Sequence, residues 1–213
     1  MIKVFFYNLD KEGLAANWDR CLAQLPEWRR ESCLRMKFEQ GRLQQLAAGL
    51  LLRLALREEG VDLMTADITK NEHGKPMMEG LYFNISHSGD YIAVAIADYP
   101  VGIDVEIKTD PDLKITERFY SEEEQRAVRD AEDPQKEFRR LWTRKEAYVK
   151  CTGTGIYDSV AKIPSLVERS GDYRIFTLQE EEEYTLSLAV RCGADAGRIE
   201  ISHETVGLPL SFP

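Results

Sequence analysis

Apolar residues recur at three- and four-residue spacing over about residues 40–58, and this pattern constrains the fold more than any other. They are Leu43, Leu46, Ala47, Leu50, Leu51 and Leu54. This period is that of one face of an α-helix, and Gly60 follows as a stop signal. We therefore predict a long amphipathic helix here, the clearest helix of the chain.

Strand patterns flank this helix in the first half of the chain. Residues 81–86 and 91–97 are apolar or alternating, and Gly89-Asp90 lies between them, which is a hairpin signal. Further predicted strands cover residues 1–8 and Val101 to Ile107. Helices are predicted at 12–24 and 26–37, the second with Pro26 at a first helical position.

The second half likewise contains predicted helices and strands. Ser121 with Glu124 has the spacing of a capping box and opens a helix to about Arg129. Asp133-Pro134 opens another helix, which runs to about Cys151 and ends at Gly153-Thr154-Gly155. Strands are predicted at 173–178, 184–190 and 198–202. We predict an α/β (α+β) protein with an N-terminal lobe at 1–100 and a C-terminal lobe at 101–213.

Composition excludes several classes of protein. The net charge of −9 disfavours a nucleic-acid partner, which needs a basic face. Four cysteines and three histidines are scattered without zinc spacing, so any metal is expected to be a hard cation held by carboxylates. No apolar run approaches the roughly 18 residues of a membrane span. The apolar N-terminus is too short for a signal peptide, so we expect a cytoplasmic protein.

One basic stretch stands out in this acidic chain. The segment from Trp28 to Arg42 has five basic residues and only two acidic ones, Glu31 and Glu39. The basic residues are Arg29, Arg30, Arg35, Lys37 and Arg42. A solvated helix face is the commoner reason for such a run. The alternative is a patch for a phosphorylated ligand or an acidic partner protein.

Two carboxylates share one face of the predicted strand at Val101–Ile107. Asp104 and Glu106 are two residues apart and project together, while Ile103 and Val105 point into the core. Paired carboxylates repel each other unless a cation or open water lies beside them, and Mg²⁺ suits such oxygen ligands. An ordinary amphipathic edge strand is the alternative.

Two further patterns carry candidate chemistry. Glu146 and Lys150 are neighbours on one helix face and form either a stabilising surface pair of about 0.2–0.5 kcal/mol or a site for a metal, a proton and a phosphate. The segment Asn84-Ile85-Ser86-His87-Ser88-Gly89 is a polar strand end whose backbone donors suit phosphate oxygens, or simply a turn with satisfied side chains. The chain has no P-loop and no dinucleotide-binding glycine motif.

Taken together, these segments resemble the Sfp-type 4′-phosphopantetheinyl transferases. The resemblance covers about residues 25–157 and rests on five motifs in the family's order. They are Gly74-Lys75-Pro76, Asn84-Ile85-Ser86-His87-Ser88-Gly89, Gly102-Ile103-Asp104-Val105-Glu106, Arg118-Phe119-Tyr120-Ser121 with Glu124, and Trp142-x-x-Lys145-Glu146-Ala147-x-x-Lys150.

The resemblance implies two similar, pseudo-symmetric lobes, each a small, mainly antiparallel sheet packed with helices, with coenzyme A in the cleft between them. Asp104, Glu106 and Glu146 would then hold Mg²⁺ at the pyrophosphate. Lys150 would contact phosphate, and Lys75, Ser86 and His87 would hold the nucleotide and its 3′-phosphate. The expected reaction moves phosphopantetheine to a serine of an apo acyl or peptidyl carrier protein and releases 3′,5′-ADP. Two lobes in one chain resemble the family's monomeric members.

Some assignments stay open. Glu146 is the first candidate for the general base, Glu124 the second, and Asp104 completes the catalytic set with Lys150. The family often has a basic residue where this chain has Gln44, so Arg42 is the nearest candidate for the adenine side. The basic stretch at 28–42 would attract acidic carriers. The alternatives are another Mg²⁺-dependent phosphoryl-transfer enzyme and a non-catalytic module that binds carriers or coenzyme A.

Overall fold

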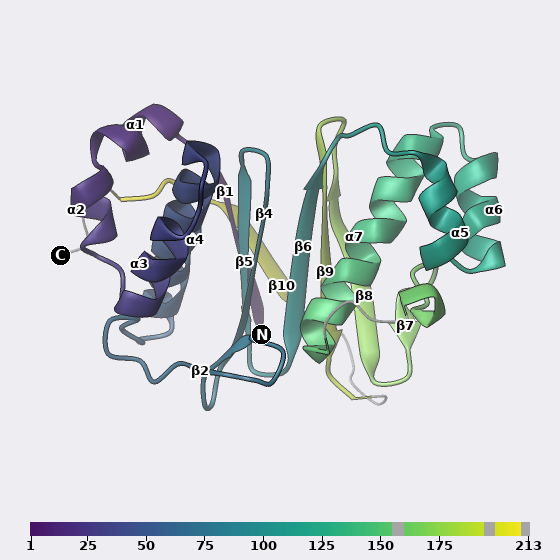
Figure 1. Cartoon of the computed structure of the whole chain (residues 1–213). Coiled ribbons are helices and arrows are strands. Elements are labelled where there is room, and N and C mark those ends of the chain that lie inside the picture. Colours follow the sequence, from purple (N-terminus) through teal and green to yellow (C-terminus); the bar gives the residue numbers. More distant parts are fainter. Residues whose placement is uncertain (155–159, 194–198, 210–213) are drawn as a thin grey trace.

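Two four-stranded sheets lie face to face at the centre of the molecule, and helices cover the outer face of each (Figure 1). The computed structural model describes residues 1–154, 160–193 and 199–209. The first sheet has the order β10-β1-β5-β4 and the second the order β6-β9-β8-β7. This mixed α/β architecture with small, mainly antiparallel sheets confirms the predicted fold class.

The first sheet contains the N-terminal strand of the chain and three others. Its members are β1 (Ile2–Asn8), β4 (Tyr82–Ser88), β5 (Tyr91–Ala97) and β10 (Ile201–Thr205). The second sheet contains β6 (Val101–Ile107), β7 (Arg169–Ser170), β8 (Tyr173–Glu180) and β9 (Tyr184–Arg191). The hairpin of β4 and β5 turns at Gly89-Asp90, as the sequence predicts.

The inner faces of the two sheets form a shared apolar core. Every second residue of four strands points into it, as expected for a side-chain period of two. Its buried members are Ile2, Val4, Phe6, Ala93, Ala95, Ala97, Val101, Ile103, Val105, Leu186, Leu188 and Val190. The inward orientation predicted for Ile103 and Val105 is therefore confirmed.

Long helices cover the outer faces. The predicted amphipathic helix is α4 (Glu39–Glu58), which packs on the first sheet together with α1 (Lys11–Ala16), α2 (Trp18–Leu22) and α3 (Glu27–Leu34). The single helix predicted at 12–24 is interrupted at Asn17, whose side chain donates to the carbonyl of Gly13.

The second sheet is covered by α7 (Pro134–Thr152), which packs closely on β6 and β9. Gly102 permits this approach, because a Cβ there would lie 2.1 Å from the carbonyl oxygen of Ala147 and 2.3 Å from the amide nitrogen of Cys151. Gly155, predicted to help end this helix, lies outside the described residues; the observed C-cap is Gly153.

The remaining elements are short, except for one helix of nine residues. They are β2 (Thr69–Lys70), β3 (Pro76–Met77), α5 (Thr116–Phe119), α6 (Glu122–Asp130) and the 3₁₀ turns Leu113–Ile115 and Val160–Lys162. The helix α6 opens with the capping box predicted at Ser121 and Glu124.

The last strand departs from the predicted division at residue 100. That division places residues 198–202 in the C-terminal lobe at 101–213, but β10 runs parallel to β1 in the first sheet, where Ile2 pairs with Ile201 and Phe6 with Thr205. Residue 198 itself lies outside the described residues. The edge of β1 that β5 leaves open accounts for this placement, because an unpaired strand edge needs a partner or a cover.

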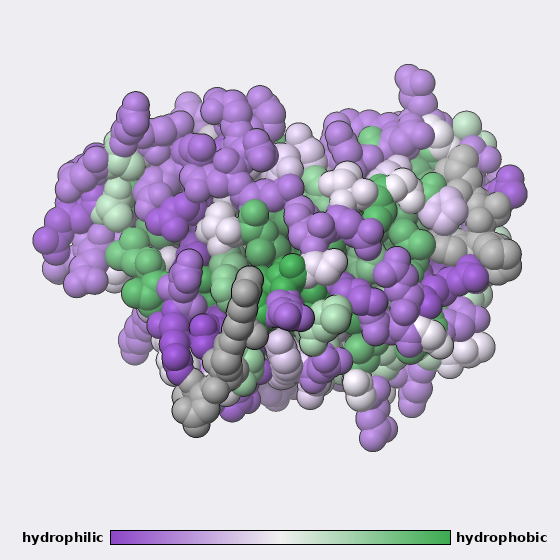
Figure 2. All heavy atoms as spheres, turned by 180° about the vertical axis from the view of Figure 1, so that it is seen from behind, coloured by the Kyte–Doolittle hydropathy of each residue, from purple (hydrophilic) through white to green (hydrophobic). Residues whose placement is uncertain are grey.

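The face of the molecule seen from behind is mostly hydrophilic. Seen from behind, apolar residues are visible only as smaller patches among hydrophilic ones (Figure 2). Over the described ranges, no helix is long and apolar enough to cross a membrane.

Candidate active site

The site begins with two carboxylates on β6 that face α7. Asp104 is only 2% exposed, and its Oδ1 atom accepts hydrogen bonds from Lys150 Nζ at 2.5 Å and Ser86 Oγ at 3.0 Å. Among the described residues, Asp104 Oδ2 is buried without a hydrogen-bond partner. Burial raises the pKa of Asp104, and Lys150 opposes this rise. A buried carboxylate with one unsatisfied oxygen can receive a further donor or a cation.

A row of polar side chains joins β4 to β6 and positions these carboxylates. Alternate residues of β4 accept hydrogen bonds from alternate backbone amides of β6, so side chains take the place of a backbone ladder between the two sheets. The pairs are Asn84 Oδ1 with Ile103 N at 2.8 Å, Ser86 Oγ with Val105 N at 3.2 Å, and Ser88 Oγ with Ile107 N at 3.2 Å. Ser88 also donates to Glu106 Oε2 at 2.7 Å.

Glu146 and Lys150 project from α7, one helical turn apart, into a pocket of about 290 Å³. Burial raises the pKa of Glu146 to about 7, and the nearby charges of Asp104 and Glu106 add to the rise while Lys150 opposes it. Glu106 likewise has a raised pKa, first from burial and then from Asp104. Three carboxylates thus share one electrostatic environment, and Lys150 directs its hydrogen bonds to Asp104 and Ser86.

The pocket lies between the two halves of the chain. Its remaining walls are His73, Gly74, Lys75, Pro76 and Asn84 from the first half, and Val149 and Gly153 from the second. The sequence motifs around residues 74–76, 84–89, 102–106 and 142–150 are therefore brought together. The ammonium of Lys75, however, donates to three backbone carbonyls, those of Val101, Lys150 and Cys151.

A second pocket of about 200 Å³ adjoins the first and shares Pro76 and Asn84 with it. His87 lies here, with its Nε2 atom 2.9 Å from Gln45 Nε2. Arg29 lines the same pocket and is 6% exposed, so it is not part of the exposed basic stretch predicted at 28–42. Sequence reasoning missed Gln45 and named Arg29 only as a member of the basic stretch, because only the packing of α3 on α4 brings both residues to His87.

Two other predicted residues lie apart from the pockets. Arg42 is exposed, and its Nε atom donates to the carbonyl of Met36 at 2.9 Å. Ser86 is buried between Asp104 and Lys150, on the opposite side of β4 from His87. Gln44, where the family often has a basic residue, donates to the carbonyl of Gly89 at 2.8 Å.

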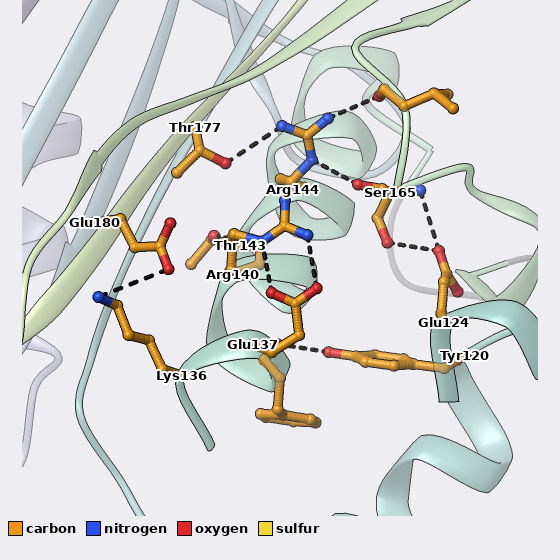
Figure 3. A network of polar contacts seen from close by, with 12 residues as sticks. Tyr120, Glu124, Lys136, Glu137, Arg140, Thr143, Arg144, Ser165, Thr177 and Glu180 are labelled. Atoms are coloured by element: carbon orange, nitrogen blue, oxygen red, sulfur yellow. Dashed lines mark hydrogen bonds and ion pairs between the residues drawn. The ribbon is translucent and has the colours of Figure 1, made fainter. Parts of the chain in front are cut away.

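Glu124 has a structural role, as its capping-box spacing predicts. Its carboxylate is 2% exposed and accepts hydrogen bonds from the backbone of Ser121, from the backbone and hydroxyl of Ser165, and from Lys145. Figure 3 shows Glu124 facing Ser165, whose carbonyl oxygen accepts from Arg144. A carboxylate with four protein donors is not free to act as a general base.

Three neighbouring carboxylates, one lining the pocket and two on β6 beside it, provide oxygen ligands that suit a hard cation. Asp104, Glu106 and Glu146 supply the oxygen ligands that Mg²⁺ prefers, and Asp104 Oδ2 needs a partner. In the described part of the chain, no group of three or more histidine, cysteine, aspartate or glutamate side chains is already arranged to hold a metal ion. The residues thus fit Mg²⁺ in chemistry, with Asp104 as the ligand that has a free oxygen.

Fold and site define an α/β protein with a pocket built by both halves of one chain, in which Glu146 and Lys150 lie beside the β6 carboxylates Asp104 and Glu106. Residues 100–196 match the family described as the 4′-phosphopantetheinyl transferase superfamily, and residues 12–98 match its N-terminal region, described as 4′-phosphopantetheinyl transferase, N-terminal. The chain belongs to the 4′-phosphopantetheinyl transferase superfamily.

Individual relatives agree with this membership. A 4′-phosphopantetheinyl transferase of Bacillus subtilis is 31% identical over 162 residues, which cover 73% of this chain and 72% of that protein. The 4′-phosphopantetheinyl transferase psf-1 of Bacillus pumilus is 30% identical over 190 residues, covering 81% and 82%. The transferase gsp of Aneurinibacillus migulanus is 44% identical over 91 residues, which cover 41% of this chain and 38% of that protein.

Proposed function

We propose that the protein transfers the 4′-phosphopantetheine moiety of coenzyme A to a serine of an apo acyl or peptidyl carrier protein, with Mg²⁺ as cofactor and 3′,5′-ADP as the leaving product. One observation carries the proposal: Glu146 and Lys150 line a pocket between the two halves, and Asp104 lies beside it with an unsatisfied buried oxygen. Family membership supports the same reaction.

Asp104, Glu106 and Glu146 would hold the Mg²⁺ ion. Burial raises the pKa of all three carboxylates, and neighbouring carboxylate charge adds to the rise for Glu106 and Glu146; a divalent cation would neutralise this negative charge. A bound Mg²⁺ would offset charge on the pyrophosphate of coenzyme A.

In the proposed reaction, the serine hydroxyl of the carrier attacks the phosphorus on the pantetheine side. A new oxygen–phosphorus bond forms, the anhydride bond to 3′,5′-ADP breaks, and the serine proton passes to Glu146. A bound Mg²⁺ would keep Glu146 ionised, the state in which a carboxylate can accept a proton. The ammonium of Lys150 would stabilise the charge on the phosphoryl oxygens.

The adjoining pocket would take the nucleotide end. His87 and Arg29 offer one titratable and one permanent cation to the 3′-phosphate, and Gln45 offers an amide. Lys75 and Ser86, which the resemblance assigns to the nucleotide, have their polar atoms bonded to protein groups. Arg42 remains a proposal from the resemblance, and it is not among the residues that line either pocket.

Intact-protein mass spectrometry tests the reaction. Several apo carrier proteins would be incubated with the protein, coenzyme A and Mg²⁺, beside an EDTA control, a Glu146→Gln variant and an exposed control, Glu117→Gln. We expect a carrier to gain one phosphopantetheine, and the gain to be lost with EDTA and with Glu146→Gln but kept with Glu117→Gln.

Other outcomes would contradict this proposal. Binding of coenzyme A without any gain on the carriers would favour the non-catalytic module. Consumption of a nucleotide without a carrier would favour another phosphoryl-transfer enzyme. The proposed active form is a monomer, because one chain supplies both walls of the pocket.

The exposed part of the basic stretch is the proposed docking surface for an acidic carrier. Arg30, Arg35, Lys37 and Arg42 are exposed there, beside Leu34 and Phe38, which are 59% and 70% exposed. Such a mixed basic and apolar surface is suited to an acidic helix with apolar side chains.

Charge reversal tests this surface. The double variant Arg30→Glu/Arg35→Glu should raise KM for the carrier about tenfold, more at low salt than at high salt, and spare coenzyme A binding. The matched control is Arg126→Glu/Arg129→Glu on α6, at the far end of the molecule from α3 (Figure 1). Equal carrier kinetics in the two double variants would rule out this docking surface.

A further inference from the structure

The turn between β2 and β3 reaches across from the first half of the chain to the end of α7. Asn71 Nδ2 donates to the carbonyl of Gly153 at 3.0 Å. Lys75 Nζ donates to Lys150 O at 2.5 Å, to Cys151 O at 3.2 Å and to Val101 O at 3.2 Å. One short turn therefore contacts both the C-terminal end of α7 and the start of β6.

The chemistry of a helix end accounts for these contacts. The last four carbonyls of an α-helix have no partner within the helix, and the negative end of its dipole attracts a cation. Lys150 and Cys151 are among the last residues of α7, so the ammonium of Lys75 caps this helix from a distant segment. An ammonium has three N–H donors, and here the three are directed to three carbonyls. In this arrangement Lys75 keeps no donor for a phosphate.

The local fit of the turn is close. Gly153 ends α7 in the left-handed conformation with φ of 72°. A Cβ at this position would lie 2.9 Å from Asn71 Nδ2 and 3.3 Å from Lys75 Cδ. The absent side chain of Gly153 is thus what allows the turn to rest on the helix end.

The same turn forms a wall of the reaction pocket. His73, Gly74 and Pro76 stand on one side, and Glu146, Val149 and Lys150 of α7 stand on the other. A contact that fixes the turn to α7 therefore fixes the distance between these walls. Burial, which lowers the pKa of Lys75, is consistent with an ammonium enclosed by protein.

We propose that Lys75 is a positioning residue, which with Asn71 clamps the 71–76 turn to the end of α7 and sets the width of the coenzyme A pocket, instead of binding the 3′-phosphate. The identity of the ligand rests on the proposed function, whereas the clamp itself rests on the contacts alone.

Steady-state kinetics with coenzyme A and with 3′-dephospho-coenzyme A separate the two roles. For a clamp, Lys75→Met should raise KM on the order of tenfold for both compounds by the same factor. Asn71→Ala should produce a smaller change of the same kind, because it removes one clamp contact and no cation. If the preference for coenzyme A over the dephospho compound disappears in Lys75→Met and persists in Asn71→Ala, Lys75 binds the 3′-phosphate and the clamp proposal is overturned.

Hydrogen exchange of the ligand-free protein gives a readout that needs no activity. Lys75→Met should increase deuterium uptake in peptides covering both 69–77 and 148–154, and Asn71→Ala should do so to a lesser degree. The matched control is Lys70→Met, an exposed lysine of β2, which should leave both peptides unchanged. Unchanged uptake in the Lys75 and Asn71 variants would refute the clamp. A wild-type protein that transfers no phosphopantetheine would instead refute the proposed function, and the exchange experiment would still decide on the clamp.

Discussion

His87 shows how one residue can couple the site to pH. Burial lowers the pKa of its imidazole, and the positive charges of Lys150 and Arg29 lower it further. The ring is therefore neutral near neutral pH in the free protein. A phosphate dianion in the adjoining pocket would act in the opposite direction, because a negative charge favours the protonated ring.

Coenzyme A binding is accordingly expected to take up a proton. The uptake should approach about one proton per bound ligand, and affinity should increase as pH falls through neutrality toward the ordinary pKa of histidine. Calorimetric titrations in two buffers of different ionisation enthalpy measure this number. His87→Asn should abolish the uptake, and 3′-dephospho-coenzyme A should show less of it. Equal uptake with both compounds would place the proton on another group.

Residue identities in the site could be predicted where local geometry suffices. Asp104 and Glu106 on a strand, and Glu146 and Lys150 on a helix, share faces because of the period of each element, and the structure places them as expected. Gln45 was not predicted, and Ser88 and Arg29 were named only as members of a motif and of the basic stretch, without a role of their own. Their contacts depend on where β4 lies against β6 and α3 against α4, which no local spacing encodes.

At the scale of elements, α7 is tied to its surroundings by buried cations. Lys145 is fully buried and donates to the carbonyls of Val160 and Ile163 as well as to Glu124 at 2.8 Å. Arg144 next to it donates to the carbonyls of Ser165 and Val167 (Figure 3). These two residues fix the segment 160–167 against α7, where Val160 and Ile163 also pack on Val149.

Removing one partner of the buried ion pair between Lys145 and Glu124 should lower the stability of the protein. Lys145→Met leaves the carboxylate of Glu124 buried without its cation, so we expect the free energy of unfolding to fall by about 3–5 kcal/mol. The double variant Glu124→Gln/Lys145→Met should lose less than the sum of the single changes. Urea unfolding measures both values, with Lys136→Met as the control at about 0–1 kcal/mol, because the ion pair of Lys136 on α7 with Glu180 on β8 is partly exposed. A Lys145→Met variant as stable as the control would contradict this prediction.

The long helices and strands were largely predictable from the sequence, whereas the two-residue strands were not. Strong periodicity and caps located α4, α6, α7 and the main strands to within a few residues. The two-residue strands β2, β3 and β7 carry no periodic signal. Asn17 breaks the first predicted helix through a side-chain contact with Gly13, which competes with the helical backbone.

At the scale of the whole molecule, the last strand of the chain pairs with the first. The strand β10 follows the second sheet in sequence but pairs with β1, the first strand of the chain. Val206, just beyond β10, continues this contact by donating to the carbonyl of Phe6 at 2.9 Å. The predicted division at residue 100 could not anticipate this return, because strand pairing between distant segments is a property of the folded sheet.

Removal of this return strand should destabilise the first sheet. A chain ended after residue 198 would expose the outer edge of β1, and we expect a thermal midpoint several degrees lower, at about 2–4 °C per kcal/mol lost, with increased self-association. Thermal unfolding and size-exclusion chromatography measure the two effects. A chain ended after Pro209 keeps β10 and is the control. Equal midpoints for the two truncations would mean that β10 adds no stability.

The hydrogen bonds between β4 and β6 come from side chains, so each of them can be removed by a single substitution. A backbone ladder cannot be altered by changing side chains, but Asn84, Ser86 and Ser88 can each be replaced separately. Two of these residues also bind a carboxylate of the site, since Ser86 donates to Asp104 and Ser88 to Glu106. Substitution of Ser86 or Ser88 would therefore alter the contact between the two sheets and the hydrogen bonding of a site carboxylate together, so neither property can change at these two positions without the other.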